Sequence, residues 1–331
     1  MSLRHSKDER SIYRRTRARS KNVALTGKTR DYLSHGSSEE NMSDRFEKQV
    51  IKDLTTRRRP RVLYHYTSGL GLLGIASSQS IWATNIRYLN DSTEYNLAIQ
   101  LARTVVEKDL ASSRGKFDTA LNTVLQERIV SQSTDVYVTS FTENEDQLSQ
   151  WRAYCPPGQG YAIGFSTKAL VPRPVSAQDR FLVPCIYDPD QQTDLMRNVV
   201  TIVLDFADEN RKSGLPHDRV LREAFKLLGR LLPMVAPALK DPGFAEEEEW
   251  RLVHLPTAFE GVSPEFRQGR SMLIPYHRII FGGGSGELPI EHIVIGPTPN
   301  AELARDAVQA LFRARATRAS VVPSAIPYRS W

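Results

Sequence analysis

Three short segments of the sequence carry side chains that could bind or transform a ligand. The first is His65-Tyr66-Thr67, which closes a β-rich run that begins at Val62. In an extended chain His65 and Thr67 point to the same face. An imidazole and a hydroxyl each donate and accept hydrogen bonds, so the pair could hold a ribose or an amide. A histidine bonded to a nearby carbonyl is the alternative interpretation.

The second segment is an acidic run that leads into Trp250 and Arg251. If the run is extended, Glu247, Glu249 and Arg251 share one face. Burial of Trp250 on the other face would then leave the two glutamates together on a cleft wall. Two close carboxylates shift each other's pKa and can act as a base or stabilise a cation. A structural ladder of ion pairs is the alternative.

The third segment, Gln150-Trp151-Arg152, places an amide, an indole and a guanidinium side by side. These groups suit stacking on a flat ligand and pairing with phosphate. Trp151 could equally anchor a core, and Arg152 could neutralise Glu247 or Glu249.

Composition and cysteine usage exclude several classes of protein. The chain has 331 residues, 40% of them hydrophobic, but no stretch long and apolar enough to cross a bilayer and no apolar region typical of a secretory signal at its start. We therefore expect a cytoplasmic protein. Its two cysteines, Cys155 and Cys185, cannot form a disulfide framework or a zinc cage, so we expect no metal. Cys155 is a candidate nucleophile, but a packing role is favoured.

The net charge of +6 is concentrated at the amino terminus. Residues 1–30 contain ten Lys or Arg and two Asp or Glu, a balance of +8, so the rest of the chain sums to about −2. We expect residues 1–44 to form a disordered basic arm. Such an arm could contact nucleic acid or another acidic partner, or it could simply be solvated.

Hydrophobic periodicity and turn residues predict an α+β fold over residues 45–331, with one mixed or mostly antiparallel sheet and flanking helices. A proline in the run 181–187 places that strand at a sheet edge. Strands are expected at 62–67, 80–84, 135–141, 160–165, 181–187, 248–255, 272–276, 292–296 and 321–322. Helices are expected at 46–54, 70–78, 92–109, 117–130, 148–153 and 300–315, with a helical insertion at about 191–240, a turn at 89–91 and a flexible loop at 282–286.

Several segments together resemble a bacterial family of unknown function in their order and spacing over residues 61–329. They are the sequences LYHYTS at 63–68, IWAT at 81–84 with LND at 89–91, LSQWRAY at 148–154, 244–253 and IGP at 295–297. The resemblance implies a bacterial protein and, for some members, a role in phage defence.

A more distant similarity is to the ADP-ribosyltransferase fold, which implies a split sheet. In that fold a His-x-Thr at the end of the first strand holds the nicotinamide ribose of NAD, and a late-strand glutamate stabilises the oxocarbenium ion. His65 and Thr67 resemble the first element, and Glu249, preceded by Glu247, resembles the second. Ser140-Phe141-Thr142 is only loosely similar to the Ser-Thr-Ser strand of the arginine-modifying branch, since it lacks the central threonine.

This similarity implies an NAD-consuming transferase or an NAD-cleaving enzyme that would act as a phage-defence or toxin effector. In it, His65 and Thr67 would orient the ribose, Arg152 would meet the pyrophosphate, and Glu249 would stabilise the developing cation. The expected catalytic residues are Glu249, Glu247 and His65. The expected NAD-binding residues are His65, Tyr66, Thr67, Trp82, Ser140, Gln150, Trp151 and Arg152. The alternative is a non-enzymatic nucleotide sensor or nucleic-acid-associated defence component, in which the basic arm contacts phosphate.

Overall fold

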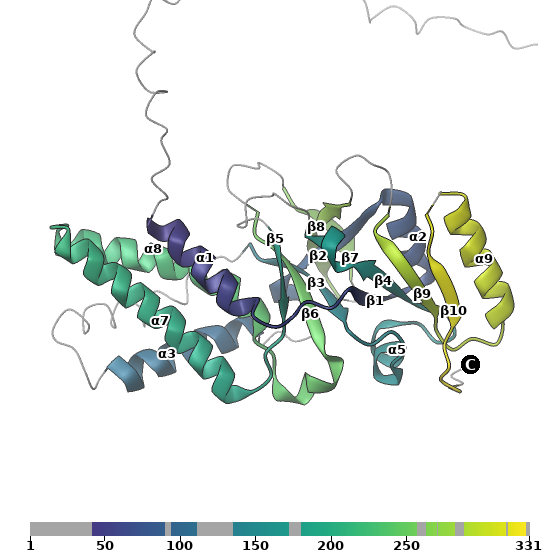
Figure 1. The fold of residues 1–331 in the computed structure, drawn as a ribbon, viewed down its shortest axis with the longest axis horizontal. Helices are drawn as coiled ribbons and strands as arrows, with labels where there is room; N and C mark the ends of the chain where they lie inside the picture. Colours follow the sequence, from purple (N-terminus) through teal and green to yellow (C-terminus); the bar gives the residue numbers. More distant parts are fainter. Residues whose placement is uncertain are drawn as a thin grey trace, which may run out of the picture. The chain divides into compact units, whose positions relative to one another are not determined.

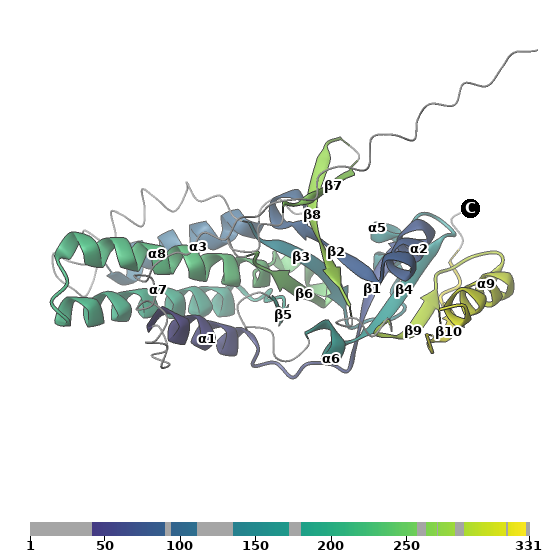
Figure 2. The ribbon, with the colours of Figure 1, turned by 90° about the horizontal axis from the view of Figure 1, so that it is seen from above.

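The computed structural model describes residues 42–89, 94–110, 135–171, 180–256, 263–269, 271–281, 288–315 and 317–328. Within these ranges ten strands form one mixed, mostly antiparallel sheet with helices around it, which confirms the α+β class (Figures 1 and 2). The strands are β1 (Val62–Ser68), β2 (Ser80–Asn85), β3 (Tyr137–Thr142), β4 (Gly160–Ser166), β5 (Arg180–Pro184), β6 (Glu249–His254), β7 (Glu265–Gln268), β8 (Leu273–Ile280), β9 (Ile290–Ile295) and β10 (Ser320–Pro323). The α-helices are α1 (Met42–Leu54), α2 (Gly69–Ser78), α3 (Glu94–Leu110), α5 (Leu148–Tyr154), α6 (Thr167–Leu170), α7 (Pro189–Lys212), α8 (His217–Val235) and α9 (Ala301–Arg313). Short 3₁₀ helices are η1 (Ile86–Tyr88), η3 (Ala236–Ala238) and η4 (Pro242–Glu247).

Some predictions concern residues outside the described ranges. They are nearly all of the arm 1–44, the end of the turn at 89–91 with the helix start that follows it, the helix 117–130 and the loop 282–286.

The sheet forks at β3. One edge of β3 pairs with β6 from Tyr137 to Thr142. The opposite edge is shared, because β1 pairs with it at Thr142 while β2 pairs at Val138 and Tyr137. Among the described strands, none therefore covers that edge around Ser140. Backbone groups at such a gap need partners other than a strand.

Two large apolar cores lie on the sheet, together with a small cluster of Tyr66, Trp151, Ala162 and Val294. In Figures 1 and 2, α1, α3, α7 and α8 run side by side at one end of the sheet, and α9 lies at the other end beside β10. The helices α7 and α8 bury one stripe each, and they meet the sheet through Val138, Val183 and Val253. The second core joins the sheet to α2 and α9 and contains Leu63 and Trp250. The first core contains Ala236 and Ala238 of η3, and the chain runs from η3 through η4 to β6. This core therefore helps to position the residues of the site that precede β6.

Two details of the sheet compare directly with the sequence. Pro184 ends β5, and within the described sheet β5 pairs only with β6, so the predicted edge position is confirmed. The strand β7 was not predicted, because its four residues, Glu-Phe-Arg-Gln, show no apolar alternation. Within the described residues, no helix has both the length and the apolar composition needed to cross a bilayer.

Candidate functional site

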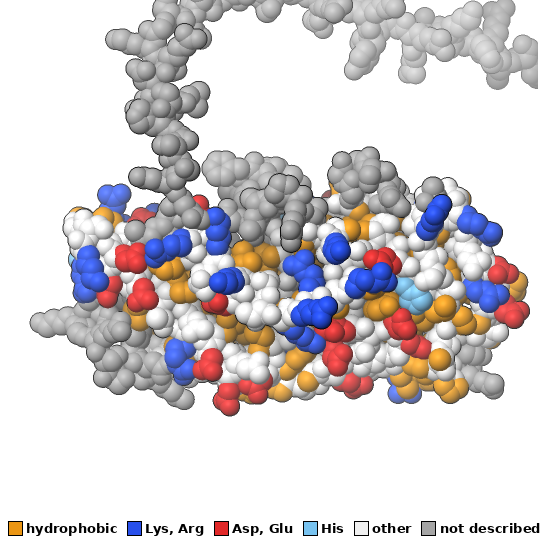
Figure 3. Space-filling view, in the orientation of Figure 1, with side chains coloured by type: hydrophobic (Ala, Val, Ile, Leu, Met, Phe, Trp, Pro, Cys, Tyr) orange, Lys and Arg blue, Asp and Glu red, His pale blue; other side chains and the backbone are white. Residues whose placement is uncertain are grey.

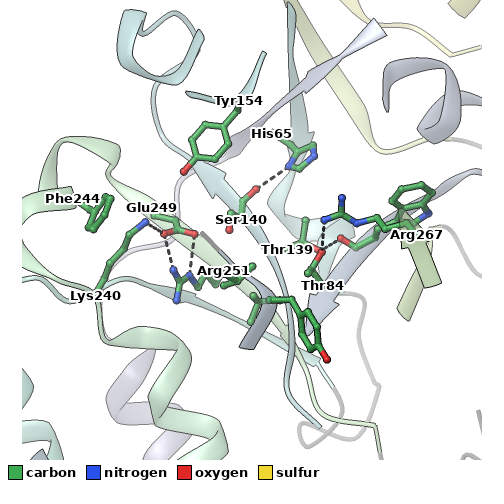
Figure 4. A pocket seen from close by; sticks show the side chains of 14 residues that line it. His65, Thr84, Thr139, Ser140, Tyr154, Lys240, Phe244, Glu249, Arg251 and Arg267 are labelled. Carbon is green, nitrogen blue, oxygen red and sulfur yellow. Dashed lines mark hydrogen bonds and ion pairs between the residues drawn. The ribbon is translucent and has the colours of Figure 1, made fainter. Parts of the chain in front are cut away.

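A cavity of about 230 Å³ opens at the fork of the sheet. It lies where β1, β2 and β3 diverge, and α5, β6 and β7 complete its walls (Figure 4). Its lining consists of His65, Trp82, Thr84, Tyr88, Leu89, Val138, Thr139, Ser140, Tyr154, Lys240, Phe244, Glu249, Arg251 and Arg267. A smaller cavity of about 50 Å³ shares His65, Ser140, Tyr154 and Glu249 with it. We call the larger one the fork cavity.

His65 uses the gap in the sheet. Its Nδ1 lies 2.9 Å from the backbone carbonyl oxygen of Ser140, where the edge of β3 opposite β6 has no neighbour among the described strands. A carbonyl oxygen only accepts, so Nδ1 carries the proton and donates. Burial lowers the pKa of His65, although the bond to Ser140 opposes that shift. The neutral ring therefore keeps Nε2 as a hydrogen-bond acceptor.

A buried ion network forms one wall of the fork cavity (Figure 4). Glu249 and Arg251 are 5% and 1% exposed, and their positions two apart on β6 put them on one face. Arg251 donates from Nε to Glu249 Oε1 at 2.9 Å and from Nη2 to Glu249 Oε2 at 3.0 Å. Lys240 donates from Nζ to Glu249 Oε2 and to Glu247 Oε2. Both oxygens of Glu249 are therefore occupied.

The charges in this network hold one another ionised. Burial alone would raise the pKa of Glu249, but the charges and hydrogen bonds of Arg251 and Lys240 lower it to about 2. Burial alone would lower the pKa of Lys240, and the carboxylates of Glu249 and Glu247 raise it above its ordinary value. A carboxylate with so low a pKa is a poor proton acceptor near neutral pH. Because Arg251 and Lys240 also bind both of its oxygens, the site does not favour Glu249 as a general base.

The acidic run does not have the predicted extended geometry. Glu247 ends the 3₁₀ helix η4, and Glu248 has the left-handed backbone conformation with φ of 42°, so β6 begins only at Glu249. The prediction that Glu247 and Glu249 share a strand face is therefore wrong. The two carboxylates still meet, because both bind Lys240. Tyr154 also donates its hydroxyl to Glu247 Oε1 at 2.9 Å.

Arg267 enters the fork cavity from β7, opposite the ion network (Figure 4). Its Nη2 donates to Thr84 Oγ1 at 3.4 Å. Its Nε is buried and has no hydrogen-bond partner among the described residues, and none of them forms an ion pair with it. Burial lowers the pKa of Arg267, but a guanidinium remains protonated in proteins.

The lining of the fork cavity is positively charged and partly aromatic. Among its described residues, Lys240, Arg251 and Arg267 are cations, and Glu249 is the one carboxylate. Trp82 is 45% exposed, and the ring of Tyr276 supports it at a centroid distance of 4.5 Å. Such a lining suits an anion that carries a flat ring.

The other predicted NAD-binding residues lie farther away. Tyr66 and Gln150 line only the smaller cavity. Thr67 packs against α2, where a Cβ on Gly71 would come within 1.9 Å of Thr67 Oγ1. Trp151 is buried and donates from Nε1 to Asp146 Oδ1 at 2.8 Å, and its ring meets that of Tyr66. The guanidinium of Arg152 lies 4.8 Å from the ring centroid of Tyr328. The structure thus gathers Trp82, Ser140, His65 and Glu249, and leaves Thr67, Trp151 and Arg152 outside the fork cavity.

The candidate nucleophile Cys155 is placed as a packing residue. Its Sγ lies 3.4 Å from the backbone carbonyl oxygen of Thr67, and burial raises the pKa of its thiol to about 12. Such a thiol stays protonated near neutral pH and is a weak nucleophile. Within the described ranges, no group of three or more His, Cys, Asp or Glu side chains is placed to hold a metal ion.

Several lining residues were not identified from the sequence. Tyr154 follows Gln150 by one helical turn, and that spacing could have drawn attention to it. Lys240 is the one charged residue in the apolar stretch 231–240, which is a usable signal for a buried, paired cation. Thr84 ends the IWAT segment at 81–84, but nothing in the sequence around Arg267 distinguishes it from an ordinary surface residue.

Comparison with known proteins finds similarity to a family of unknown function and gives no information about activity. A family model described as protein of unknown function (DUF2971) matches residues 150–252. This segment runs from α5 through β6, so it includes Tyr154, Lys240, Glu249 and Arg251 but neither His65 nor Arg267. No curated protein and no solved structure matches the chain. The similarity to the ADP-ribosyltransferase fold therefore stays a prediction.

Proposed function

We propose that the fork cavity binds a nucleotide, with a phosphate on Arg267 and a flat ring against Trp82, and that NAD is the first nucleotide to test. Arg267 carries the proposal, because its half-buried guanidinium faces the cavity without an anionic partner among the described residues. A buried donor left unpaired costs about 1–3 kcal/mol, and more when it is charged. A phosphate oxygen would supply the missing acceptor, and guanidinium groups bind phosphate in a bidentate fashion.

The aromatic and polar walls support the same ligand class. Trp82 is held from one side by Tyr276 and presents its other surface, which suits stacking on a base or a nicotinamide. His65 keeps Nε2 as an acceptor, which suits a ribose hydroxyl. The cavity of about 230 Å³ is smaller than the roughly 300–1,000 Å³ typical of sites for whole organic ligands. We therefore expect one nucleotide unit inside and the remainder of a dinucleotide outside.

The test is a titration of wild type and Arg267→Ala with NAD, AMP and pyrophosphate by calorimetry. The variant should bind each of them roughly 10- to 100-fold more weakly, since it loses a charge-assisted bond to phosphate. Arg278→Ala is the matched control, because Arg278 lies on β8 of the same hairpin, pairs with Glu265 and does not line the cavity. Equal affinities of wild type and Arg267→Ala, or no binding of any of the three compounds to wild type, would overturn the proposal.

Cleavage of NAD is the second candidate function, and the placement of His65 and Glu249 in one cavity favours it. The bond between ribose C1′ and the nicotinamide nitrogen would break, and its electron pair would leave with nicotinamide. Water or an acceptor group would then bond to C1′ and release its proton to the solvent. Glu249 would stabilise the cationic ribose electrostatically, although Arg251 and Lys240 already occupy both of its oxygens. Chromatography of the NAD titration samples measures released nicotinamide and so distinguishes the two functions. If NAD binds and no nicotinamide is released, the protein binds NAD without cleaving it.

A further inference from the structure

A second cavity lies on the opposite face of β6 from the ion network. It measures about 740 Å³, and the connection from α1 to β1 forms one side of it. Trp250 and Leu182 form its floor, whereas the neighbours of Trp250 on β6, Glu249 and Arg251, line the fork cavity. Side chains alternate along a strand, so the two cavities lie on opposite faces of the sheet. We call this second one the basic groove.

The basic groove is lined by a row of cations. Arg57, Arg58, Arg59 and Arg61 come from the α1–β1 connection and Lys168 comes from α6, against the one described carboxylate, Glu143. Figure 3 shows Lys and Arg side chains gathered across the middle of the face on which this connection runs in Figure 1. The excess of positive charge sets the groove apart from the near-neutral balance of the chain outside residues 1–30.

Hydrogen bonds fix the backbone of Pro60 and Arg61 to the first residue of α6. Thr167 is buried, and its Oγ1 donates to the backbone oxygen of Pro60 at 2.6 Å. The amide nitrogen of Thr167 donates to the backbone oxygen of Arg61 at 3.0 Å. Pro60 itself restricts φ within the row. The cations are therefore presented on an ordered support, and a ligand would not have to order the chain before binding.

Two of the five cations have no partner in the described part of the chain. Arg57 pairs with Glu143 at 2.7 Å, and Arg61 pairs with Glu291 at 3.0 Å. Arg58 and Lys168 are exposed and form no ion pair or hydrogen bond with any described residue. These two side chains remain available to an external anion.

We propose that the basic groove binds the phosphodiester backbone of a nucleic acid. In an extended chain the Cα atoms of Arg57 and Arg61 lie at most about 13–14 Å apart, and over such a length of helix axis one strand of B-DNA carries about four phosphates. A row of cations matches repeated charges better than it matches one phosphate group. The stretch 1–30 is itself strongly basic, so its charge does not complement that of the groove.

The floor of the groove argues against a membrane as the partner. Trp250 and Leu182 are 1% and 0% exposed, so the groove offers no apolar side chain for insertion among lipid headgroups. Phosphate contacts position a nucleic acid without reading its sequence. We therefore expect binding with little sequence preference and a steep dependence on salt. The inference does not rest on the nucleotide in the fork cavity.

The test compares the full-length chain with the double variant Arg58→Glu/Lys168→Glu. The readout is fluorescence anisotropy with labelled single- and double-stranded DNA and RNA over a series of salt concentrations. The variant should lose about tenfold or more in affinity at moderate salt, and the slope of log K against log salt should fall by about 2. The control Arg219→Glu/Arg222→Glu makes the same change in net charge on the exposed side of α8 and should lose less than about twofold.

Three results would overturn the inference. The first is an unchanged affinity of Arg58→Glu/Lys168→Glu for nucleic acid, and the second is an equal loss of affinity in the α8 control. The third is a loss of affinity that appears only for anionic vesicles or phosphopeptides in parallel titrations. Circular dichroism melts of all proteins show whether each variant is folded, and NAD titration of the double variant should match wild type. If the fork-cavity proposal is wrong, the NAD titration will show it, and the slope of log K against log salt for nucleic acid will not change.

Discussion

The two faces of β6 use charge in opposite ways. On one face Glu249 and Arg251 are almost fully buried, and they form an ion network with Lys240 beside the fork cavity. On the other face Trp250 is buried as an apolar floor, and the cations of the basic groove stand exposed at its rim. Successive residues of β6 thus line two different sites: the fork cavity, where the charges pair with one another, and the basic groove, where cations are exposed to solvent.

The difference shows where a charge holds structure and where it can attract a partner. Buried ions cost several kcal/mol each to desolvate, so Glu249, Arg251 and Lys240 depend on one another, and removal of one leaves the others uncompensated. Exposed ions are solvated by water and contribute little to stability. Mutations of the buried ions should therefore change the free energy of unfolding, and mutations of the exposed cations should change the affinity for a partner.

The largest effect on stability is expected for Glu249→Gln. The variant leaves Arg251 and Lys240 buried with one fewer negative charge, and we expect the free energy of unfolding to fall by about 3–5 kcal/mol. Urea denaturation monitored by circular dichroism measures it. Glu223→Gln is the control, because it removes a carboxylate from an exposed pair with Lys226 and should cost less than about 1 kcal/mol. Similar losses in the two variants would break the comparison between buried and exposed charge.

A second test follows the stability of the same two variants as the pH is lowered. Arg251 and Lys240 lower the pKa of Glu249 from 4.5 to about 2, so the folded state binds its proton less readily than the unfolded state does. The resulting stability is complete above pH 4.5 and is lost as the pH falls toward 2, and it amounts to about 3 kcal/mol. Urea unfolding at a series of pH values should show this loss in Glu223→Gln but not in Glu249→Gln. Parallel curves for the two variants would remove Glu249 as its source.

Much of the fold follows from local sequence patterns. The proline in β5 marked a sheet edge, and the apolar stripe of α9 marked an amphipathic helix, because burial on one face imposes a period on the sequence. The strand β7 was missed, since four residues are too few to show a period. The fork at β3 could not be predicted either. It depends on where β1 and β2 leave a shared edge, which is a matter of register between distant segments.

The site was predicted where a residue type is unusual for its setting. His65 and Glu249 were singled out for that reason, and the structure places both at the fork cavity. Lys240 reaches the same cavity from the connection between η3 and η4, and Arg267 reaches it from β7; no local sequence pattern predicts that these residues meet. Arg152 looked suited to phosphate, but it lies over Tyr328. Side-chain chemistry can be recognised in a sequence, whereas convergence in space requires the fold.

The smallest effect is expected on the open face, for Arg57→Ala. Arg57 is half exposed, pairs with Glu143 and lies 5.6 Å from the ring centroid of Trp250, so its loss should lower the free energy of unfolding by only about 0.2–1 kcal/mol. A double-mutant cycle of Arg57→Ala with Glu143→Gln isolates the pair and should give a coupling energy below about 1 kcal/mol. Trp250 Nε1 also donates to Glu143 Oε1 at 2.7 Å, so Glu143→Gln alone should cost more than Arg57→Ala. A coupling energy as large as the loss of unfolding free energy in Glu249→Gln would mean that Arg57 stabilises the fold in the way that the buried ions do. The two faces of β6 would then differ only in the exposure of their charges.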